Sequence, residues 1–366
     1  MKKTGIGIIG CGTISGIYMR TMAQFRHLAR VACADKLAER AAAQAQQFNI
    51  PKAVSVEELL ADDSVDIVVN LTVPLAHAEV SRKALAAGKH VYSEKPLAID
   101  RQEGRALLEL AAHKGLRIGC APDTFLGAGL QTCRKLIDEG AIGEPVACHA
   151  FMLCHGHESW HPAPEFYYQR GGGPMRDMGP YYLTALIFLL GPVAAVSGSA
   201  HTTFAERIIT SAPKAGTVIP VEVPTHLVGL LEFSSGIPGV LVTSFDVWTS
   251  TLPRIEIYGT EGTLLVPDPN TFGGPVKLWR RQTREWEEAP LSFPYETNSR
   301  GLGVAEMAAA LASGVPHRAS ADLAFHVIDI MDAVEDAARA RRQVRIESTC
   351  ARPEPLPAGF LKALTS

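Results

Sequence analysis

Two segments far apart in the chain carry residue types that are suited to proton transfer. Lys95 lies in the segment Tyr92-Ser93-Glu94-Lys95-Pro96, just after the end of a predicted strand. A lysine that is partly removed from water can have its pKa lowered, and it can then exchange a proton with a hydroxyl group. Asp177 and Tyr181 stand four residues apart and share one face if a single helix contains both. The alternative for Lys95 is an ordinary surface lysine without a catalytic role. The alternative for Tyr181 is a residue that only begins a core helix.

A glycine-rich turn near the N-terminus has the pattern of a phosphate-binding loop. Gly10-Cys11-Gly12-Thr13-Ile14-Ser15 follows a predicted strand and opens a predicted helix, although Ser15 replaces the usual third glycine. The first glycine permits a tight turn, and the second lets a pyrophosphate approach the backbone. Asp35 ends the second predicted strand, where an acid accepts hydrogen bonds from the adenosine ribose and repels a 2′-phosphate. These residues predict an NAD site, with NADP as an alternative because Lys36 is adjacent.

A loop rich in histidine precedes the glycine segment that contains Asp177. Residues 154–162 hold His155, His157, Glu158, Trp160 and His161. Such side chains can bind hydroxyl groups and offer an aromatic face to a sugar ring. The histidines at 155 and 157 and the acid at 158 could instead bind a metal, but their spacing fits no helical pair of ligands, and we predict no metal. A polar surface loop is the structural alternative.

Strands and helices alternate through the first third of the chain. We expect strands at residues 5–10, 31–34, 65–71, 90–93 and 117–120, with helices at 15–25, 38–48, 77–87 and 101–114. Strands separated by helices of this length indicate a parallel sheet in a doubly wound Rossmann fold. In such sheets ligands bind at the carboxyl ends of the strands, where Lys95 is expected. The predicted dinucleotide-binding domain comprises residues 1–121.

The pattern changes in residues 122–366. We expect helices at 130–139, 304–312 and 321–340 and a helical segment within 171–190, with strands at 146–153, 225–233, 239–245, 254–258, 263–266, 276–280 and 344–347. This pattern predicts an α/β domain with a large open sheet of mixed or antiparallel strands. The helix at 321–340 is a candidate to pack back on the first domain.

The composition excludes several classes of protein. The 366 residues include 35 Lys+Arg and 38 Asp+Glu, a net charge of −3, and 47% hydrophobic residues. This balance argues against a disordered chain and against a binder of nucleic acid. The apolar stretch 181–190 has about half of the ~20 residues that span a bilayer. We therefore expect a cytoplasmic protein without a membrane partner.

Several of these segments, taken in chain order, resemble the Gfo/Idh/MocA oxidoreductases, a group similar to glucose–fructose oxidoreductase and inositol dehydrogenase. The carrying residues are 10–15, the turn Thr72-Val73-Pro74 with His77, and 87–96, 171–179 and 258–263. The resemblance implies hydride transfer between NAD(P) and a hydroxyl of a sugar, glycoside or polyol. It also implies that the open sheet forms contacts in a homo-oligomer, a dimer or tetramer. It places the cofactor against Thr72, Pro74, His77 and Glu94, and the position of Lys95 after its strand directs Lys95 toward the nicotinamide as well.

The resemblance also assigns the catalytic residues, with one departure. Lys95, Asp177 and Tyr181 are predicted to be catalytic, but many members of the family have histidine where this chain has Tyr181. Tyrosine has a pKa near ~10 and needs a cationic neighbour to act as a base, for which Lys95 is the predicted candidate. Asp177 is predicted to hold Lys95 or a substrate hydroxyl. The predicted substrate contacts are His157, Trp160, His161, Tyr168, Asp177 and Tyr181.

Two other functions fit the same residues. An oxidation followed by elimination, with recycled NAD, would cleave a glycoside without net reduction of the cofactor. A regulator that senses NAD(P) without catalysis could use the same fold, and the departure at Tyr181 keeps that interpretation open. Asn298 and Arg300 form a late polar loop that either reaches the cleft or caps the helix that follows.

Overall fold

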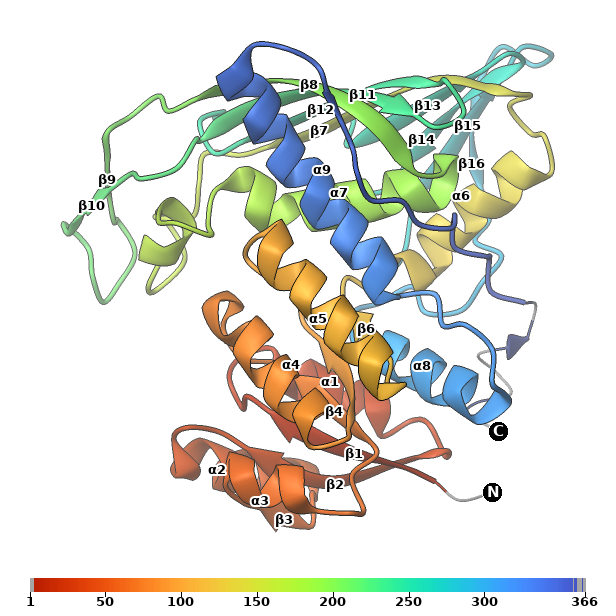
Figure 1. Ribbon diagram of the computed structural model, residues 1–366. Helices are drawn as coiled ribbons and strands as arrows, with labels where there is room; N and C mark the ends of the chain where they lie inside the picture. The colour runs from red at the N-terminus through yellow and green to blue at the C-terminus, as the bar shows by residue number, and fades with distance from the viewer. Residues whose placement is uncertain (1–2, 358, 361–363, 365–366) are drawn as a thin grey trace.

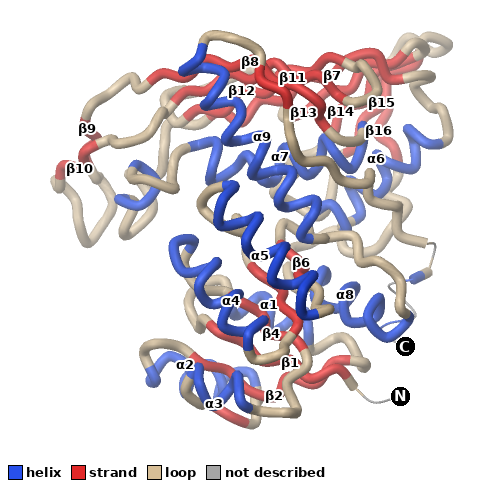
Figure 2. The backbone as a smooth tube through the Cα atoms, in the orientation of Figure 1, coloured by secondary structure: helices blue, strands red, loops and turns tan. Residues whose placement is uncertain are grey.

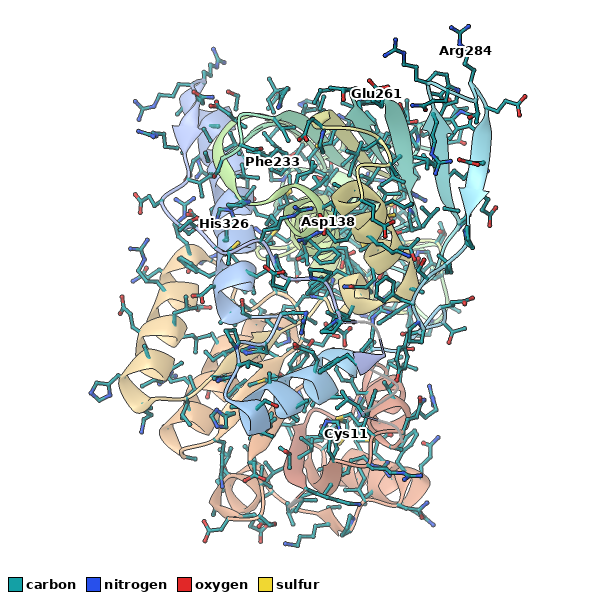
Figure 3. The ribbon with its side chains drawn as sticks, turned by 90° about the vertical axis from the view of Figure 1, so that its right-hand side faces the viewer. Cys11, Asp138, Phe233, Glu261, Arg284 and His326 are labelled. Carbon is teal, nitrogen blue, oxygen red and sulfur yellow. The ribbon has the colours of Figure 1, made fainter. Side chains whose placement is uncertain are left out.

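The computed structural model describes residues 3–357, 359–360 and 364. A parallel sheet lies at one end of the molecule and a larger sheet at the other, with layers of helices between them (Figures 1 and 2). In the view of Figure 3, Cys11 marks the end with the parallel sheet, and Phe233 and Glu261 mark the other end. Core side chains with almost no exposure occur in both halves.

The first sheet has six parallel strands in the order β3-β2-β1-β4-β5-β6. They are β1 (Thr4–Ile9), β2 (Leu28–Ala34), β3 (Lys52–Ala53), β4 (Ile67–Asn70), β5 (His90–Ser93) and β6 (Ile118–Cys120). This is the predicted Rossmann fold, and the strand order reverses between β1 and β4, where dinucleotides bind. The sequence prediction missed β3, because two exposed residues carry no hydrophobic pattern.

Helices flank this sheet on both faces. They are α1 (Ser15–Met22), α2 (Ala38–Phe48), α3 (Val56–Ala61), α4 (His77–Ala86) and α5 (Arg101–Lys114). The prediction also missed α3, although Ser55 and Glu58 form a capping box that marks its start. The carboxylate of Asp100 accepts the backbone N–H of Glu103 at 3.0 Å and caps α5.

The second sheet has nine strands in the order β16-β15-β14-β13-β7-β12-β11-β8-β17. Its strands are β7 (Pro145–Leu153), β8 (Val193–His201), β11 (His226–Phe233), β12 (Pro238–Ser244), β13 (Ile255–Gly259), β14 (Gly262–Val266), β15 (Val276–Arg280), β16 (Trp286–Ala289) and β17 (Val344–Arg345). Only β7 and β12 pair in parallel, so the predicted mixed sheet is confirmed. The prediction gave no bounds for β8 and β16, nor for the separate hairpin of β9 (Glu206–Ile208) and β10 (Val218–Pro220).

Helices cover one face of the large sheet and leave the other face open (Figure 1). They include α6 (Ala128–Asp138), α7 (Pro174–Leu190) and α9 (Ala321–Ala340), while α8 (Leu302–Ser313) lies toward the Rossmann sheet. Pro174 occupies the first turn of α7, so the helix begins before Asp177, and Pro180 lies inside it. No helix among the described residues combines the length and apolarity needed to cross a membrane.

Helix α9 connects the two sheets, because it packs against β8 and also against α5. The Arg101 guanidinium at the start of α5 lies 2.8 Å from the Asp336 carboxylate and 3.1 Å from that of Asp329. The backbone N–H of Arg101 donates to Asp332 at 3.1 Å. One turn of the Rossmann half is thus tied to three carboxylates on α9.

A buried carboxylate connects the segment that follows β6 to the turn that precedes α8. Asp123 follows β6 and is 1% exposed. It accepts the backbone N–H groups of Gly301 and Gly303 at 2.8 and 2.9 Å. Burial raises the pKa of Asp123 to about 6, although these two hydrogen bonds act in the opposite direction.

The raised pKa of Asp123 predicts a pH dependence of stability. An unfolded chain loses this proton near pH 3.9, and the folded chain loses it near pH 6, so the unfolded chain ionises first. The free energy of unfolding should therefore fall by about 3 kcal/mol as the pH rises from about 4 to about 7. Asp123→Asn should remove this contribution, and chemical denaturation across that range measures it. The exposed Asp63→Asn is the matched control and should follow the wild type; equal slopes for all three proteins would contradict the prediction.

Candidate active site

The phosphate-binding loop has one glycine that the fold requires and one that faces open space. Gly10 has a φ of +101°, and a Cβ there would lie 2.5 Å from the backbone of Leu71. A Cβ on Gly12 would have no atom within 4 Å. Ser15 closes the turn by donating its hydroxyl to the carbonyl of Gly12 at 2.7 Å. The open side at Gly12, before the N-terminus of α1, fits the approach of a pyrophosphate.

The acid at the end of β2 is fixed beside this loop. Asp35 accepts the backbone N–H of Cys11 at 2.7 Å with one oxygen and that of Leu37 at 2.9 Å with the other. Each carboxylate oxygen has a second lone pair that can accept a ribose hydroxyl. The residues at this crevice therefore fit an NAD dinucleotide.

The part of the crevice that is predicted to hold the nicotinamide contains a buried histidine. His77 is 1% exposed, and its ring nitrogens lie 2.7 Å from the carbonyl oxygen of Pro96 and 2.9 Å from that of Thr72. We expected His77 to contact the cofactor, but these two carbonyls occupy both of its nitrogens. His77 instead ties the Thr72 turn, where Pro74 begins a short 3-10 helix, to the segment that carries Lys95.

The carboxylate beside Lys95 is also held by the protein. Glu94 is 9% exposed and accepts the hydroxyl of Tyr18 at 2.7 Å and the backbone N–H of Lys95 at 2.9 Å. The Lys95–Pro96 peptide bond is cis. Glu94 therefore fixes the direction in which the chain enters the cleft.

An ion pair joins the two halves of the molecule at this point. The Lys95 Nζ donates to the Asp177 carboxylate at 2.9 Å and to the Asp177 carbonyl at 2.6 Å. The two side chains are only 16% and 19% exposed. Asp177 lies in the first turn of α7, so the helix brings it to the end of β5.

The protonation state of Lys95 differs from the sequence prediction. Burial disfavours the ammonium, as we expected, but the negative charge of Asp177 outweighs it and raises the pKa of Lys95 above its ordinary value. Burial also acts against the charge of Asp177, yet Lys95 holds the pKa of that carboxyl well below its usual range. Lys95 is therefore an ammonium at neutral pH, and its N–H groups are hydrogen-bond donors.

His157 contacts the other oxygen of the same carboxylate. Its Nε2 lies 3.2 Å from Asp177, and the residue is 8% exposed. The rings of Tyr167, Phe245 and Trp160 pack around it at 4.1, 4.7 and 5.2 Å between centroids. His157 thus supports Asp177 from the histidine loop, a role that the sequence alone did not indicate.

Tyr181 lies one turn after Asp177 on α7 and beneath the ammonium. The Lys95 Nζ is 5.0 Å from the centroid of the Tyr181 ring, over its face. The cation that donates a hydrogen bond to the phenol oxygen is instead Arg300, whose Nη2 lies 3.4 Å away. Lys95 was the predicted partner of the hydroxyl, but its pairing with Asp177 holds it above the ring.

Tyr168, a predicted substrate contact, is a structural residue. It is fully buried, and its hydroxyl donates to Glu158. Glu158 also pairs with Arg207 at 2.8 Å, and Arg207 pairs in turn with Asp246. This buried group anchors the histidine loop to β9 and to the end of β12.

The remaining predicted substrate residues lie at the outer part of the loop. Trp160 is 61% exposed and contacts the rings of His157 and His161 through its edge. His161 accepts the backbone N–H of Ala163 at 3.1 Å. Within the described parts of the chain, no group of three or more potential ligands could hold a metal ion.

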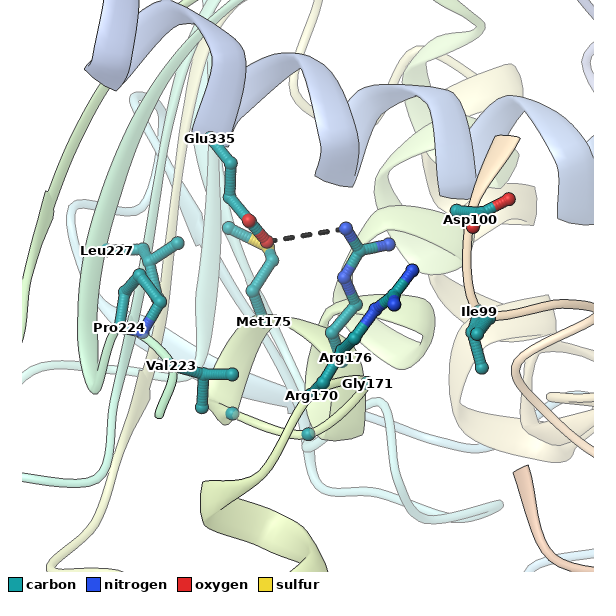
Figure 4. A pocket seen from close by; sticks show the side chains of 12 residues that line it. Ile99, Asp100, Arg170, Gly171, Met175, Arg176, Val223, Pro224, Leu227 and Glu335 are labelled. Carbon is teal, nitrogen blue, oxygen red and sulfur yellow. Dashed lines mark hydrogen bonds and ion pairs between the residues drawn. The ribbon is translucent and has the colours of Figure 1, made fainter. Parts of the chain in front are cut away.

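A cavity of about 180 Å³ lies at the start of α7 and is distinct from this cluster. Its lining includes Gly171, Arg176 and Glu335, and Figure 4 shows the ion pair of the last two. None of Lys95, Asp177 and Tyr181 lines it.

Known proteins resemble the chain over most of its length. Residues 4–121 match the oxidoreductase family with an NAD-binding Rossmann fold, and residues 130–265 match the GFO/IDH/MocA C-terminal domain. A 1,5-anhydro-D-fructose reductase from Ensifer adhaerens is 32% identical over 71% of this chain and 74% of that protein. A levoglucosan dehydrogenase from Pseudarthrobacter phenanthrenivorans is 26% identical over 72% and 74%. The crystal structure of an NAD-binding oxidoreductase from Klebsiella pneumoniae has the same fold, with a TM-score of 0.82, 23% identity and coverage of 94% and 99%.

We expect substitutions at Gly10 and Gly12 to have different effects. Gly12→Val should weaken NAD binding by about 10-fold or more, because the new side chain occupies the open side of the loop, and it should leave the melting temperature nearly unchanged. Gly10→Ala should lower the melting temperature, because its Cβ meets the backbone of Leu71. Calorimetric titration with NAD and thermal denaturation measure both effects. Unchanged NAD affinity in a folded Gly12→Val protein would exclude this loop as the dinucleotide site.

Proposed function

Because the chain belongs to the Gfo/Idh/MocA family of oxidoreductases, we propose that it transfers a hydride between NAD and a hydroxyl-bearing carbon of a sugar, glycoside or polyol. The observation that carries this proposal is the ion pair of Lys95 and Asp177 at the carboxyl end of β5, beside the cofactor crevice. The two relatives named above, a 1,5-anhydro-D-fructose reductase and a levoglucosan dehydrogenase, support the substrate class. NAD is favoured over NADP because Asp35 would repel a 2′-phosphate.

NAD, when bound, accepts or supplies the hydride at its nicotinamide ring. The residues proposed to hold it are Gly10, Gly12, Thr13 and Ile14 at the pyrophosphate, Asp35 at the ribose, and Thr72, Pro74, Glu94 and Lys95 near the nicotinamide. In reduction the Lys95 ammonium donates a hydrogen bond to the carbonyl oxygen and stabilises the negative charge that develops there. Asp177 keeps Lys95 charged and directed toward this oxygen, and Tyr181 completes the catalytic group.

The proposed substrate contacts come from the histidine loop. His157, which bonds to Asp177, is near the reacting carbon in this proposal, and Trp160 and His161 lie farther out. The exposed Trp160 ring suits stacking on the apolar face of a sugar. We leave Tyr168 out of the substrate contacts because it is buried.

The open face of the large sheet supports a proposed homo-oligomer, a dimer or tetramer. Val228, Val242 and Phe151 stand opposite one another on β11, β12 and β7, and Leu230 and Val240 form the next row. The Leu230 side chain is 55% exposed. An apolar surface of this extent on a sheet is typical of a contact between subunits. The described cysteines are all free thiols, which supports the proposed cytoplasmic location.

Removal of the Lys95 amine tests the proposed chemistry. Lys95→Ala should lower kcat/KM by about 100-fold or more with an accepted sugar or polyol, because the oxygen loses its cationic donor. NAD affinity should change little, which calorimetric titration checks. Lys83→Ala, a surface lysine paired with Glu79, is the matched control and should keep full activity.

Three results would contradict or redirect this proposal. Full turnover by Lys95→Ala with NAD bound would exclude the role of the amine. Release of an aglycone from a glycoside without net formation of NADH would indicate oxidation and elimination. NAD binding without turnover across a panel of sugars, glycosides and polyols would favour a sensor.

A charge on the open sheet face tests the proposed assembly. Leu230→Glu should shift the protein toward monomer, because the carboxylate would have to be buried between subunits. Sedimentation velocity measures this change, and Val315→Glu, an exposed position outside the sheet, is the control. A wild-type protein that sediments as a monomer would refute the assembly.

A further inference from the structure

The guanidinium of Arg300 lies beside the phenol oxygen of Tyr181, although the two residues are far apart in the chain. Its Nη2 is 3.4 Å from the oxygen, and its central carbon is 5.8 Å from the ring centroid. Arg300 precedes α8, in a turn that Asp123 fixes through the backbone N–H groups of Gly301 and Gly303. The guanidinium therefore belongs to a segment that is anchored to the chain just after β6.

The hydrogen-bond partners that the structure gives to Arg300 are all neutral. Nη1 donates to the Asn298 side chain at 2.9 Å, and Nη2 donates to the Asn270 carbonyl at 3.2 Å and to its side-chain oxygen at 2.5 Å. Among the described residues, no carboxylate lies within 4.0 Å of this guanidinium. The phenol of Tyr181 is thus the one bonded group that can itself become an anion.

The surroundings of Tyr181 place opposing demands on its proton. Burial, together with the negative charge of Glu94, raises the pKa of Tyr181 above its ordinary value, while the positive charges of Lys95 and Arg300 act to lower it. Only 7% of the residue is exposed, so water contributes little to stabilising an anionic oxygen. The two cations take the place of that water.

The two cations contact different parts of the tyrosine. Lys95 directs two N–H groups at Asp177 and lies over the ring face. Arg300 alone donates to the oxygen among the hydrogen bonds that the described residues make. The charge of Lys95 has the larger electrostatic effect on the phenol, and Arg300 adds a direct hydrogen bond to its oxygen.

We infer that Arg300 is a positioning residue that makes the phenol of Tyr181 the proton-exchanging group of this site. This inference rests on the proposed oxidoreductase function. In oxidation, the O–H proton of the substrate passes to the tyrosinate oxygen as the C–H electron pair leaves as hydride to NAD; reduction reverses both transfers. Arg300 keeps its own protons throughout and stabilises the tyrosinate by a charge-assisted hydrogen bond. The guanidinium thereby adapts the site to a tyrosine at this position.

The first test measures the Tyr181 proton directly, in the absence of NAD and substrate. Tyrosine labelled with ¹³C at Cζ reports phenol ionisation by NMR, and Tyr181→Phe identifies the signal. Arg300→Met should move the titration of Tyr181 upward by about one pH unit or more, because a neighbouring cation is lost. Arg300→Lys should restore part of the shift, and Arg281→Met, at an exposed arginine, should leave it unchanged. An unmoved Tyr181 signal in Arg300→Met would overturn the inference.

The second test uses turnover of an accepted substrate and a double-mutant cycle. Arg300→Met should lower kcat by about 10-fold or more with KM within about threefold, and it should shift the pH profile of kcat. In a Tyr181→Phe background the same substitution should change kcat by less than about twofold, because the two residues act as a unit. A rise in KM with an unchanged pH profile would instead make Arg300 a substrate-binding residue and would contradict the inference. If no substrate is turned over, the proposed function fails while the NMR titration still decides the role of Arg300.

Discussion

The ion pair of Lys95 and Asp177 is the constraint on which the site depends, because each partner belongs to a different half of the molecule. Lys95 follows β5 of the parallel sheet by two residues, and Asp177 lies in the first turn of α7, which supports the large sheet. Two charges that are more than four-fifths buried are tolerable only when they meet. A relative shift of the halves would separate the two charges. The pair therefore forms only when the segment after β5 lies beside the first turn of α7.

Asp177 is itself held in place by residues farther from Lys95. One carboxylate oxygen accepts from Lys95 and the other lies beside His157. The loop that carries His157 is held in turn by Glu158, which pairs with the buried Arg207. The cluster is therefore supported by the β9 hairpin as well as by the two large sheets. The β9–β10 hairpin therefore helps to position the candidate site, although its two strands bury few residues.

The sequence predicted the Rossmann half well, because its strands and helices have distinct periods and its glycine loop has a known physical use. It placed α2, α5 and α9 at their observed bounds, since each has a clear amphipathic face and a capping or glycine residue near an end. It failed for β3 and the β9 hairpin, which are too short to show a period. It also misplaced Tyr168, because an aromatic residue near a polar loop looks the same in sequence whether it faces solvent or the core.

The sequence by itself determined the family, the glycine-rich loop and the types of residue proposed to do the chemistry, since these reside in short motifs whose backbone needs are local. Only the tertiary structure decided the charge of Lys95, the neighbours of Tyr181 and the support of Asp177 by His157. Those properties depend on which charges meet across more than 80 residues of chain, as Lys95 and Asp177 do. Electrostatic interactions act through space and vary with burial, so the spacing of residues along a chain does not contain them.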